Sequence, residues 1–209
     1  MSLMSIRRRR AAQKGFNLIE AAIVLGIVGL VVGGIWVAAT SVYANLRSKS
    51  ATDQLLAIAQ GVRALYATSA NMANTAADVT ALMAQANVLP GDVLTTARSA
   101  ATSANTVNPW NGLIGVVGNA AANATSFAVI YSNVPSAACV DFVLRNVGTS
   151  HDTGMSNVYY GATGAVNALP GANIAVAPGA AITLVNTQTA CDTAGGTVRN
   201  IGFMFSLKG

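Results

Sequence analysis

The first third of the chain carries two hydrophobic patterns in succession. Residues 21–42 contain no charged side chain, and Thr40 and Ser41 are their only hydroxyl residues. About 20 apolar residues suffice to cross a bilayer as a helix. Beyond this segment, apolar residues recur every three or four positions, as in an amphipathic helix: Ala51, Leu55, Ile58, Ala59, Val62, Leu65 and Tyr66. The two patterns predict one helix over residues 16–68, about 80 Å long at 1.5 Å per residue.

Residues 69–209 predict a head of shorter helices and strands. Residues 75–78 form a capping box (Thr75 and Asp78), which predicts a short helix that ends near Asn87 and is stopped by Leu89-Pro90-Gly91. A turn signal at 108–112 leads into a strand at 113–117. A second strand at 127–131 would complete a hairpin with the first.

The last part of the chain mixes one clear strand with a long stretch of weak signals. Pro135 is expected to open a helix that runs to about Arg145. Residues 148–196 are rich in Gly, Ala, Asn and Thr, and are expected to form loops with a strand at 181–185. Ile201, Phe203, Phe205 and Leu207 alternate with other residues and predict a final strand. The fold class is therefore predicted as α+β, a long N-terminal helix packed on a mostly antiparallel sheet.

Charge is concentrated before the apolar segment. Five of the 12 basic residues are Arg7 to Arg10 and Lys14, and the remaining seven equal the seven acidic ones. This block favours a cytoplasmic N-terminus and export of everything after about residue 43. The other basic residues are too scattered for a nucleic-acid surface, and no nucleic-acid binding is predicted.

Two ordinary explanations exist for the basic block and the apolar segment. A cleaved secretory signal has the same order of regions, and 42–44 could serve as a weak cleavage site, but its apolar region spans about 7 to 15 residues. An uncleaved signal anchor fits the length. Neither explains an acid, Glu20, at the start of the segment, or the Gly15-Phe16 junction before it.

The two cysteines, Cys139 and Cys191, favour a disulfide, because their number is even and the head is expected to be exported. A metal site would need more ligands than the single histidine, His151, supplies. His151 and Asp152 lack a nucleophile in any recognisable motif. We therefore predict no enzyme activity, no cofactor and no metal.

The junction Lys14-Gly15-Phe16-Asn17-Leu18-Ile19-Glu20, between a basic leader and a glycine-containing apolar helix, closely resembles the prepilin signature of type IV pilins and type II secretion pseudopilins. The resemblance implies that a prepilin peptidase cuts between Gly15 and Phe16 on the cytoplasmic side, and that Phe16 is then N-methylated. Residues 1–15 would be the leader. Residues 16–68 would form the long helix, with about 16–42 in the membrane before assembly and in the filament core afterwards.

An unpaired carboxylate among apolar helices is costly, roughly 2.5 to 3.5 kcal/mol or more at a membrane centre, so Glu20 needs a cation. The resemblance implies that Glu20 of one subunit meets the Phe16 amine of its neighbour and sets the axial register of the filament. If the segment were an ordinary membrane helix, Glu20 would instead lie at the headgroup level. Pilins often carry a proline in this segment. Here any loosening of the helix on assembly is expected at Gly33-Gly34, because glycine costs about 1 kcal/mol relative to alanine in a helix.

The resemblance implies a structural subunit of an extracellular type IV pilus, a homopolymer handled by prepilin peptidase and the pilus assembly machinery. The precursor would lie in the inner membrane with a periplasmic head. The short leader and Phe16 resemble those of type IVa pilins. The long segment between the cysteines, Leu89-Pro90 and the turn at 108–112 more closely resemble type IVb pilins. We therefore expect the type IVb subclass. The alternatives are a type II secretion pseudopilin and a single-pass anchored binding domain that never polymerises.

Overall fold

The computed structural model describes residues 17–72, 77–119, 123–147, 154–161, 164–169, 184–192 and 198–208. The chain divides into two compact units, residues 1–43 and 44–209. Helix α1 (Leu18–Leu65) begins in the first unit and ends in the second. Its bounds agree with the predicted helix over 16–68 within a few residues.

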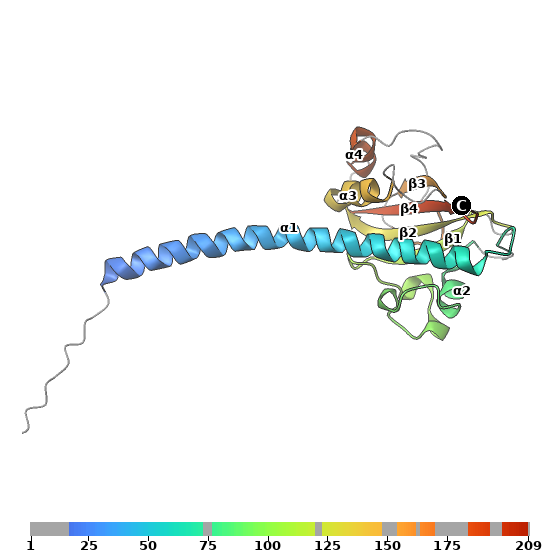
Figure 1. The fold of residues 1–209 in the computed structure, drawn as a ribbon, viewed down its shortest axis with the longest axis horizontal. Coiled ribbons are helices and arrows are strands. Elements are labelled where there is room, and N and C mark those ends of the chain that lie inside the picture. The colour runs from blue at the N-terminus through green and yellow to red at the C-terminus, as the bar shows by residue number, and fades with distance from the viewer. Residues whose placement is uncertain are drawn as a thin grey trace, which may run out of the picture. The chain divides into compact units, whose positions relative to one another are not determined.

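The second unit contains the remaining elements, labelled in Figure 1. In chain order these are α2 (Thr80–Gln85), the 3-10 turns η1 (Gly91–Val93), η2 (Arg98–Ala100) and η3 (Ser103–Asn105), β1 (Ile114–Gly118), β2 (Ser126–Pro135), α3 (Ser136–Val147), β3 (Met155–Gly161), α4 (Leu184–Asp192) and β4 (Val198–Ser206).

The described strands form a four-stranded antiparallel sheet in the order β1-β2-β4-β3. The predicted hairpin is confirmed, because β1 and β2 pair with Ile114 opposite Tyr131 and Gly118 opposite Phe127. The final strand β4 lies between β2 and β3, so the sheet joins segments that are far apart in the sequence. Together with α1, this sheet confirms the predicted α+β fold.

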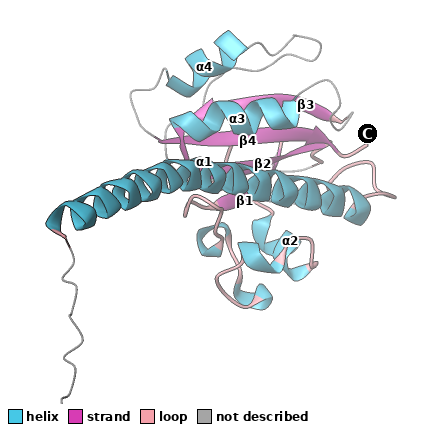
Figure 2. Cartoon of the chain, turned by 60° about the vertical axis from the view of Figure 1, so that its left-hand side comes forward, coloured by secondary structure: helices cyan, strands magenta, loops and turns pink. Residues whose placement is uncertain are grey.

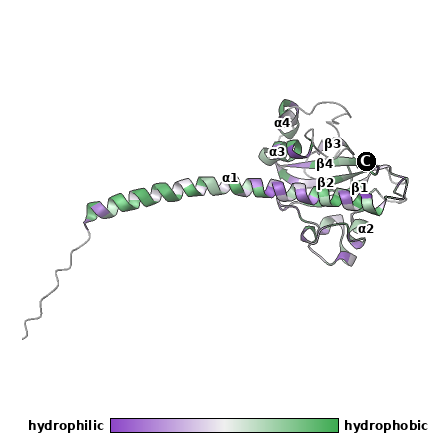
Figure 3. Ribbon diagram, viewed as in Figure 1, coloured by the Kyte–Doolittle hydropathy of each residue, from purple (hydrophilic) through white to green (hydrophobic). Residues whose placement is uncertain are grey.

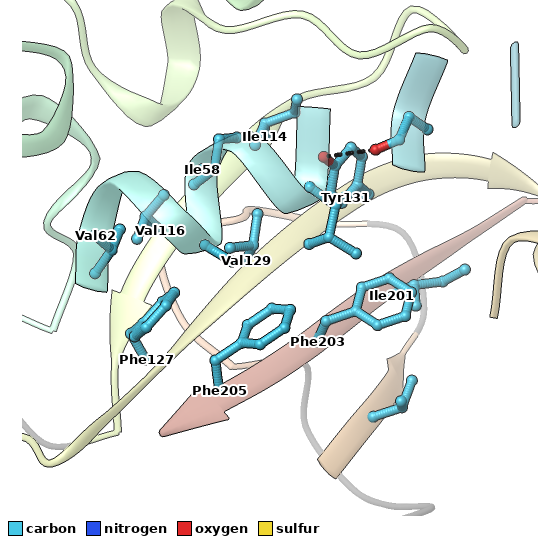
Figure 4. Close-up of a cluster of buried hydrophobic side chains, with 14 of the residues drawn as sticks. Ile58, Val62, Ile114, Val116, Phe127, Val129, Tyr131, Ile201, Phe203 and Phe205 are labelled. Carbon is cyan, nitrogen blue, oxygen red and sulfur yellow. Dashed lines mark hydrogen bonds between the residues drawn. The ribbon is translucent and has the colours of Figure 1, made fainter. Parts of the chain in front are cut away.

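The alternation of side chains along the strands gives the sheet two apolar faces. One face carries Phe127, Val129 and Tyr131 of β2 and Phe203 and Phe205 of β4, and is in the main core. Helices α1 and α3 lie over this face (Figure 2). The close-up in Figure 4 shows Ile58 and Val62 of α1 beside these strand residues.

The opposite face of the sheet has a smaller cluster of its own. Val117, Ala128, Ile130 and Met204 pack there with Val166, which lies in the segment 164–169. This segment approaches β1 so closely that a Cβ on Gly115 would collide with the Val166 carbonyl group. A glycine at 115 is therefore required for this part of the chain to cover the sheet.

The amphipathic pattern of α1 is confirmed in its second half. Ala51, Leu55, Ile58, Ala59 and Val62 are fully buried against the sheet, whereas Leu65, predicted on the same face, is 44% exposed at the end of the helix. The Tyr131 hydroxyl donates a hydrogen bond of 3.2 Å to the Ala51 carbonyl oxygen, drawn as a dashed line in Figure 4. This buried contact fixes the helix along the strand. Burial raises the pKa of Tyr131 well above its usual value, and the nearby Asp92 carboxylate adds to the rise.

Three local predictions for the head were wrong. The short helix α2 begins at Thr80, and Asp78 accepts a hydrogen bond from the Thr80 amide at 2.9 Å, so helix start and capping box do not coincide. The predicted end of this helix is confirmed, because α2 ends at Gln85, close to Asn87, which takes a positive φ of 62° before Leu89-Pro90-Gly91. Part of the strand expected at 181–185 lies outside the described residues, and its last two residues belong to helix α4.

The third error is strand β3, which was expected to be loop. Its residues carry no clear alternation, and they become a strand by pairing with β4, for example Tyr160 with Ile201. The other expectations were confirmed: β1 and β2 are extended, α3 begins one residue after Pro135, and β4 contains the predicted final strand except Leu207, which follows its last residue.

Candidate functional site

The first unit presents an apolar helix surface that nothing in the described chain covers. Large side chains along this part of α1 are exposed, including Leu18 at 88%, Leu30 at 79% and Trp36 at 73%. By length and composition the segment could cross a membrane, and none of its most apolar stretch is buried. Figure 3 shows the contrast between this apolar part and the mixed polar and apolar second half of α1. A surface of this kind requires a lipid or protein partner.

Glu20 lies in the first turn of α1 and is exposed. Within the described residues its carboxylate makes no hydrogen bond or ion pair. The Asn17 carbonyl oxygen accepts a hydrogen bond from the Ala21 amide at 3.1 Å, so the helix is already formed next to Glu20. Gly15 and Phe16, the predicted cleavage and methylation site, lie outside the described residues, as does the leader.

The glycines of the apolar segment lie within an unbroken helix. Gly26, Gly29, Gly33 and Gly34 have no heavy atom within 4 Å of the position a Cβ would take, apart from neighbouring helix backbone. They therefore leave shallow places on the helix surface at which another helix could approach closely. A role for Gly33 and Gly34 in assembly stays a prediction.

The predicted disulfide between Cys139 and Cys191 is confirmed. It joins α3 to α4 across a sequence separation of 52 residues, with a Cα–Cα distance of 6.0 Å, and both cysteines are buried. The Arg199 Nε atom donates a hydrogen bond of 2.8 Å to the Cys191 carbonyl oxygen at the end of α4. The disulfide and the buried Arg199 side chain thus hold α4 to the rest of the head.

Removing the disulfide with Cys139→Ser and Cys191→Ser together is expected to lower the free energy of unfolding of the head by about 2 to 4 kcal/mol, since the closed loop is long. Urea unfolding of the purified chain, followed by near-ultraviolet circular dichroism, measures the change. Wild-type protein in reducing agent is the control and should match the variant. Unchanged stability in both would contradict a stabilising role for the bond.

A groove lies beside the second half of α1, and sequence reasoning did not find it. It has a volume of about 430 Å³ and is lined by residues from α1 and from the chain around η1. The lining residues are Leu46, Lys49, Ser50, Asp53, Gln54, Ala57, Pro90 and Asp92. The positions on α1 follow helical spacing and could have been recognised as one face, but the contribution of Asp92 depends on the tertiary fold.

The floor of this groove, which we call the α1–η1 groove, contains a buried amide. Gln54 is only 8% exposed although its side chain is polar. Its Nε2 atom donates a hydrogen bond of 2.7 Å to Asp92 Oδ2. Its Oε1 atom is buried without a hydrogen-bond partner in the described part of the chain. Throughout the described residues, the groove included, no group of three or more His, Cys, Asp or Glu side chains could hold a metal ion.

The family model described as PilS N terminal matches residues 46–201, about three quarters of the chain. The chain therefore belongs to the family that this model describes, PilS N terminal.

Two solved structures are similar in fold. One is TcpA, a type IV pilin from Vibrio cholerae El Tor biotype, at 19% identity and a TM-score of 0.49, covering 77% of this chain and 99% of the other. The second is a type IVb pilin from Salmonella typhi, at 19% identity and a TM-score of 0.48, with the same coverage. No curated protein matches the chain.

Proposed function

We propose that this chain is the polymerising subunit of a type IVb pilus. The observation that carries the proposal is the uncovered apolar half of α1, attached to a folded and disulfide-bonded head. Before assembly a bilayer would cover this surface, and after assembly the same surface of other copies would cover it. Burial of about 25 cal/mol per Å² of apolar surface favours both states.

In this proposal the precursor lies in the inner membrane with its N-terminus in the cytoplasm and its head in the periplasm. Prepilin peptidase cleaves between Gly15 and Phe16, Phe16 is methylated, and the assembly machinery moves the subunit into an extracellular filament. The leader is residues 1–15, the helix 16–68 and the head 69–209. Membership of the PilS N terminal family supports these steps.

Glu20 would pair with the N-terminal amine of Phe16 on an adjacent subunit. The support is chemical, because Glu20 is exposed and has no partner in its own described chain, while cleavage at Gly15 would create a new cation four residues away. A charge-assisted pair is favoured strongly in an apolar environment. This pairing would give each subunit a fixed axial position.

Mass spectrometry of the mature N-terminus tests the proposal. A chain that begins with methylated Phe16 is the expected result, whereas an intact Met1 or a start near Asn45 would reject it. Electron microscopy of sheared surface material should then show long fibres. A short periplasmic assembly would instead indicate a pseudopilin, and the absence of any assembly would indicate a membrane-anchored binding domain.

Gly33 and Gly34 are expected to allow local loosening of α1 on assembly, since adjacent glycines weaken the helix. Gly33→Ala with Gly34→Ala should therefore reduce filament yield more than Gly26→Ala does. High-resolution density of the filament is the direct measurement. A helix that is unbroken through Gly34 in that density would refute the prediction.

A further inference from the structure

The lining of the α1–η1 groove has an ordered chemistry. Along α1 an exposed apolar residue, Leu46, comes first, followed by the cation Lys49 and then the anion Asp53. Asp92, from η1, adds a second carboxylate. The groove thus offers an apolar site, a cationic site and an anionic site in that order.

The two charges on α1 do not neutralise each other. Lys49 and Asp53 are four residues apart, a spacing at which Cβ atoms lie about 5 to 6 Å from each other and opposite charges often pair. Among the described residues, neither takes part in an ion pair within 4 Å. Both are exposed. Each charge is therefore available to a ligand.

At the anionic end of the groove, a buried side-chain amide holds one of the carboxylates in place. The Gln54 amide is held by its bond to Asp92, and its Oε1 atom has no partner in the described chain. The Asp92 carboxylate is near enough to Tyr131 to raise the pKa of its hydroxyl group. A ligand that brings N–H donors and positive charge to this end would pair with the Asp53 and Asp92 carboxylates.

The position of the groove in the sequence indicates where such a ligand comes from. Leu46 follows the last residue of the first unit, Tyr43, by three positions, so the groove begins where the apolar segment ends. In the membrane-inserted precursor proposed above, this is the level of the lipid headgroups. Basic residues on the exported side of a span run against the usual distribution of charge. Lys49 is such a residue, and binding of a lipid phosphate would account for a basic residue at this position.

We propose that the α1–η1 groove binds a membrane phospholipid with a phosphoethanolamine headgroup. Leu46 contacts the glycerol end, Lys49 binds the phosphate, and Asp53 and Asp92 accept hydrogen bonds from the ammonium. The order of these residues, leading away from the apolar segment, is the order of groups in the lipid. The groove volume of about 430 Å³ lies within the range of ligand pockets, about 300 to 1,000 Å³.

The same lining excludes two related headgroups. A choline group carries no N–H donor for Asp53 and Asp92, and quaternary ammonium ions are bound by aromatic rings, which none of the lining residues supplies. A phosphatidylglycerol headgroup would satisfy Lys49 and leave the carboxylates without a cation. The groove therefore predicts selectivity for ethanolamine lipid.

The test uses the full chain in vesicles that hold phosphatidylethanolamine and phosphatidylcholine in equal amounts with a constant fraction of phosphatidylglycerol. After mild detergent extraction, native mass spectrometry counts the lipids retained on the protein. We expect the wild-type chain to retain ethanolamine lipid about tenfold over choline lipid, which corresponds to 1.4 kcal/mol. The preference should weaken at high ionic strength.

Asp53→Asn and Lys49→Gln each remove one recognition group from an exposed position. Asp53→Asn should abolish the preference for ethanolamine over choline, and Lys49→Gln should lower retention of all phospholipids. Asp141→Asn and Lys208→Gln, which change exposed charges of the head outside the groove, are the matched controls and should behave as wild type. Disulfide formation in each variant verifies that the head is folded.

The proposal about the groove rests on the proposed membrane-inserted precursor. The results of these experiments distinguish failure of the groove proposal from failure of the proposed function. A chain that does not float with vesicles of any composition would overturn both. A chain that floats, yet retains the two lipids equally or keeps its preference in Asp53→Asn, would overturn the groove proposal alone. Loss of filaments in Asp53→Asn without any change in lipid retention would identify the groove as a contact between subunits and would also overturn it.

Discussion

Glu20→Ala is expected to abolish filament formation while leaving the precursor in the membrane with a folded head. The variant removes the carboxylate that is proposed to pair with the Phe16 amine of a neighbour. That amine would then enter an apolar bundle unpaired, at a cost of several kcal/mol for each subunit added. Sheared filament yield measures the effect, and a decrease of at least a hundredfold is expected, because a loss of about 3 kcal/mol corresponds to that ratio.

Two controls separate pairing from other roles of Glu20. Glu20→Gln keeps the shape of the side chain without its charge and should also fail to assemble, whereas Asp141→Asn removes an exposed head carboxylate and should assemble normally. Mass spectrometry should show the same mature N-terminus in all three variants. Polymerisation of Glu20→Ala with wild-type yield and subunit spacing would contradict the electrostatic basis of the proposed assembly.

Gly112→Ala is expected to destabilise the head by roughly 4 kcal/mol or more, among the largest effects of single substitutions. A Cβ at this position would lie well inside contact distance of the Ser132 carbonyl oxygen and 2.6 Å from the carbonyl carbon. The neighbouring backbone cannot move away easily. The Asn108 side chain accepts hydrogen bonds from the Trp110 and Gly112 amides at 2.8 and 3.0 Å, and donates one to the Ser132 carbonyl oxygen at 2.7 Å.

Urea unfolding monitored by near-ultraviolet circular dichroism measures the loss, since the core aromatic residues Trp110 and Phe142 pack edge to face at 5.2 Å. Gly164→Ala is the matched control, because no heavy atom lies within 4 Å of the position its Cβ would take, and it should change stability by less than about 0.5 kcal/mol. Equal stability of the two variants would show that the turn can relax, contrary to the tight packing around Gly112.

Elements with a strong local pattern were predictable from the sequence. Helix α1 follows from its apolar run and its three-to-four spacing, and β4 follows from the alternation of Ile201, Phe203 and Phe205. The β1-β2 hairpin follows from two apolar runs of matched length. In each case one face or the whole surface of the element is apolar, and burial of that surface decides its conformation.

Elements with weak local patterns were not predictable. Helix α4 contains Val185, Thr187 and Thr189, which favour strands, and it is helical where the disulfide and Arg199 hold its last turn. Strand β3 has its conformation because β4 supplies backbone partners for it. Strand propensity depends on the neighbours that a segment acquires, so the segment alone does not reveal the outcome.

For the candidate site, the sequence by itself determined the apolar helix, the isolated acid Glu20 and the pair of cysteines, because these depend on composition and on order along one element. Only the tertiary structure decided that Gln54 is buried and that Asp92 completes the groove beside α1. The reason is physical. A helix fixes its own spacing through local hydrogen bonds, whereas contact between residues 38 positions apart depends on how the whole head packs.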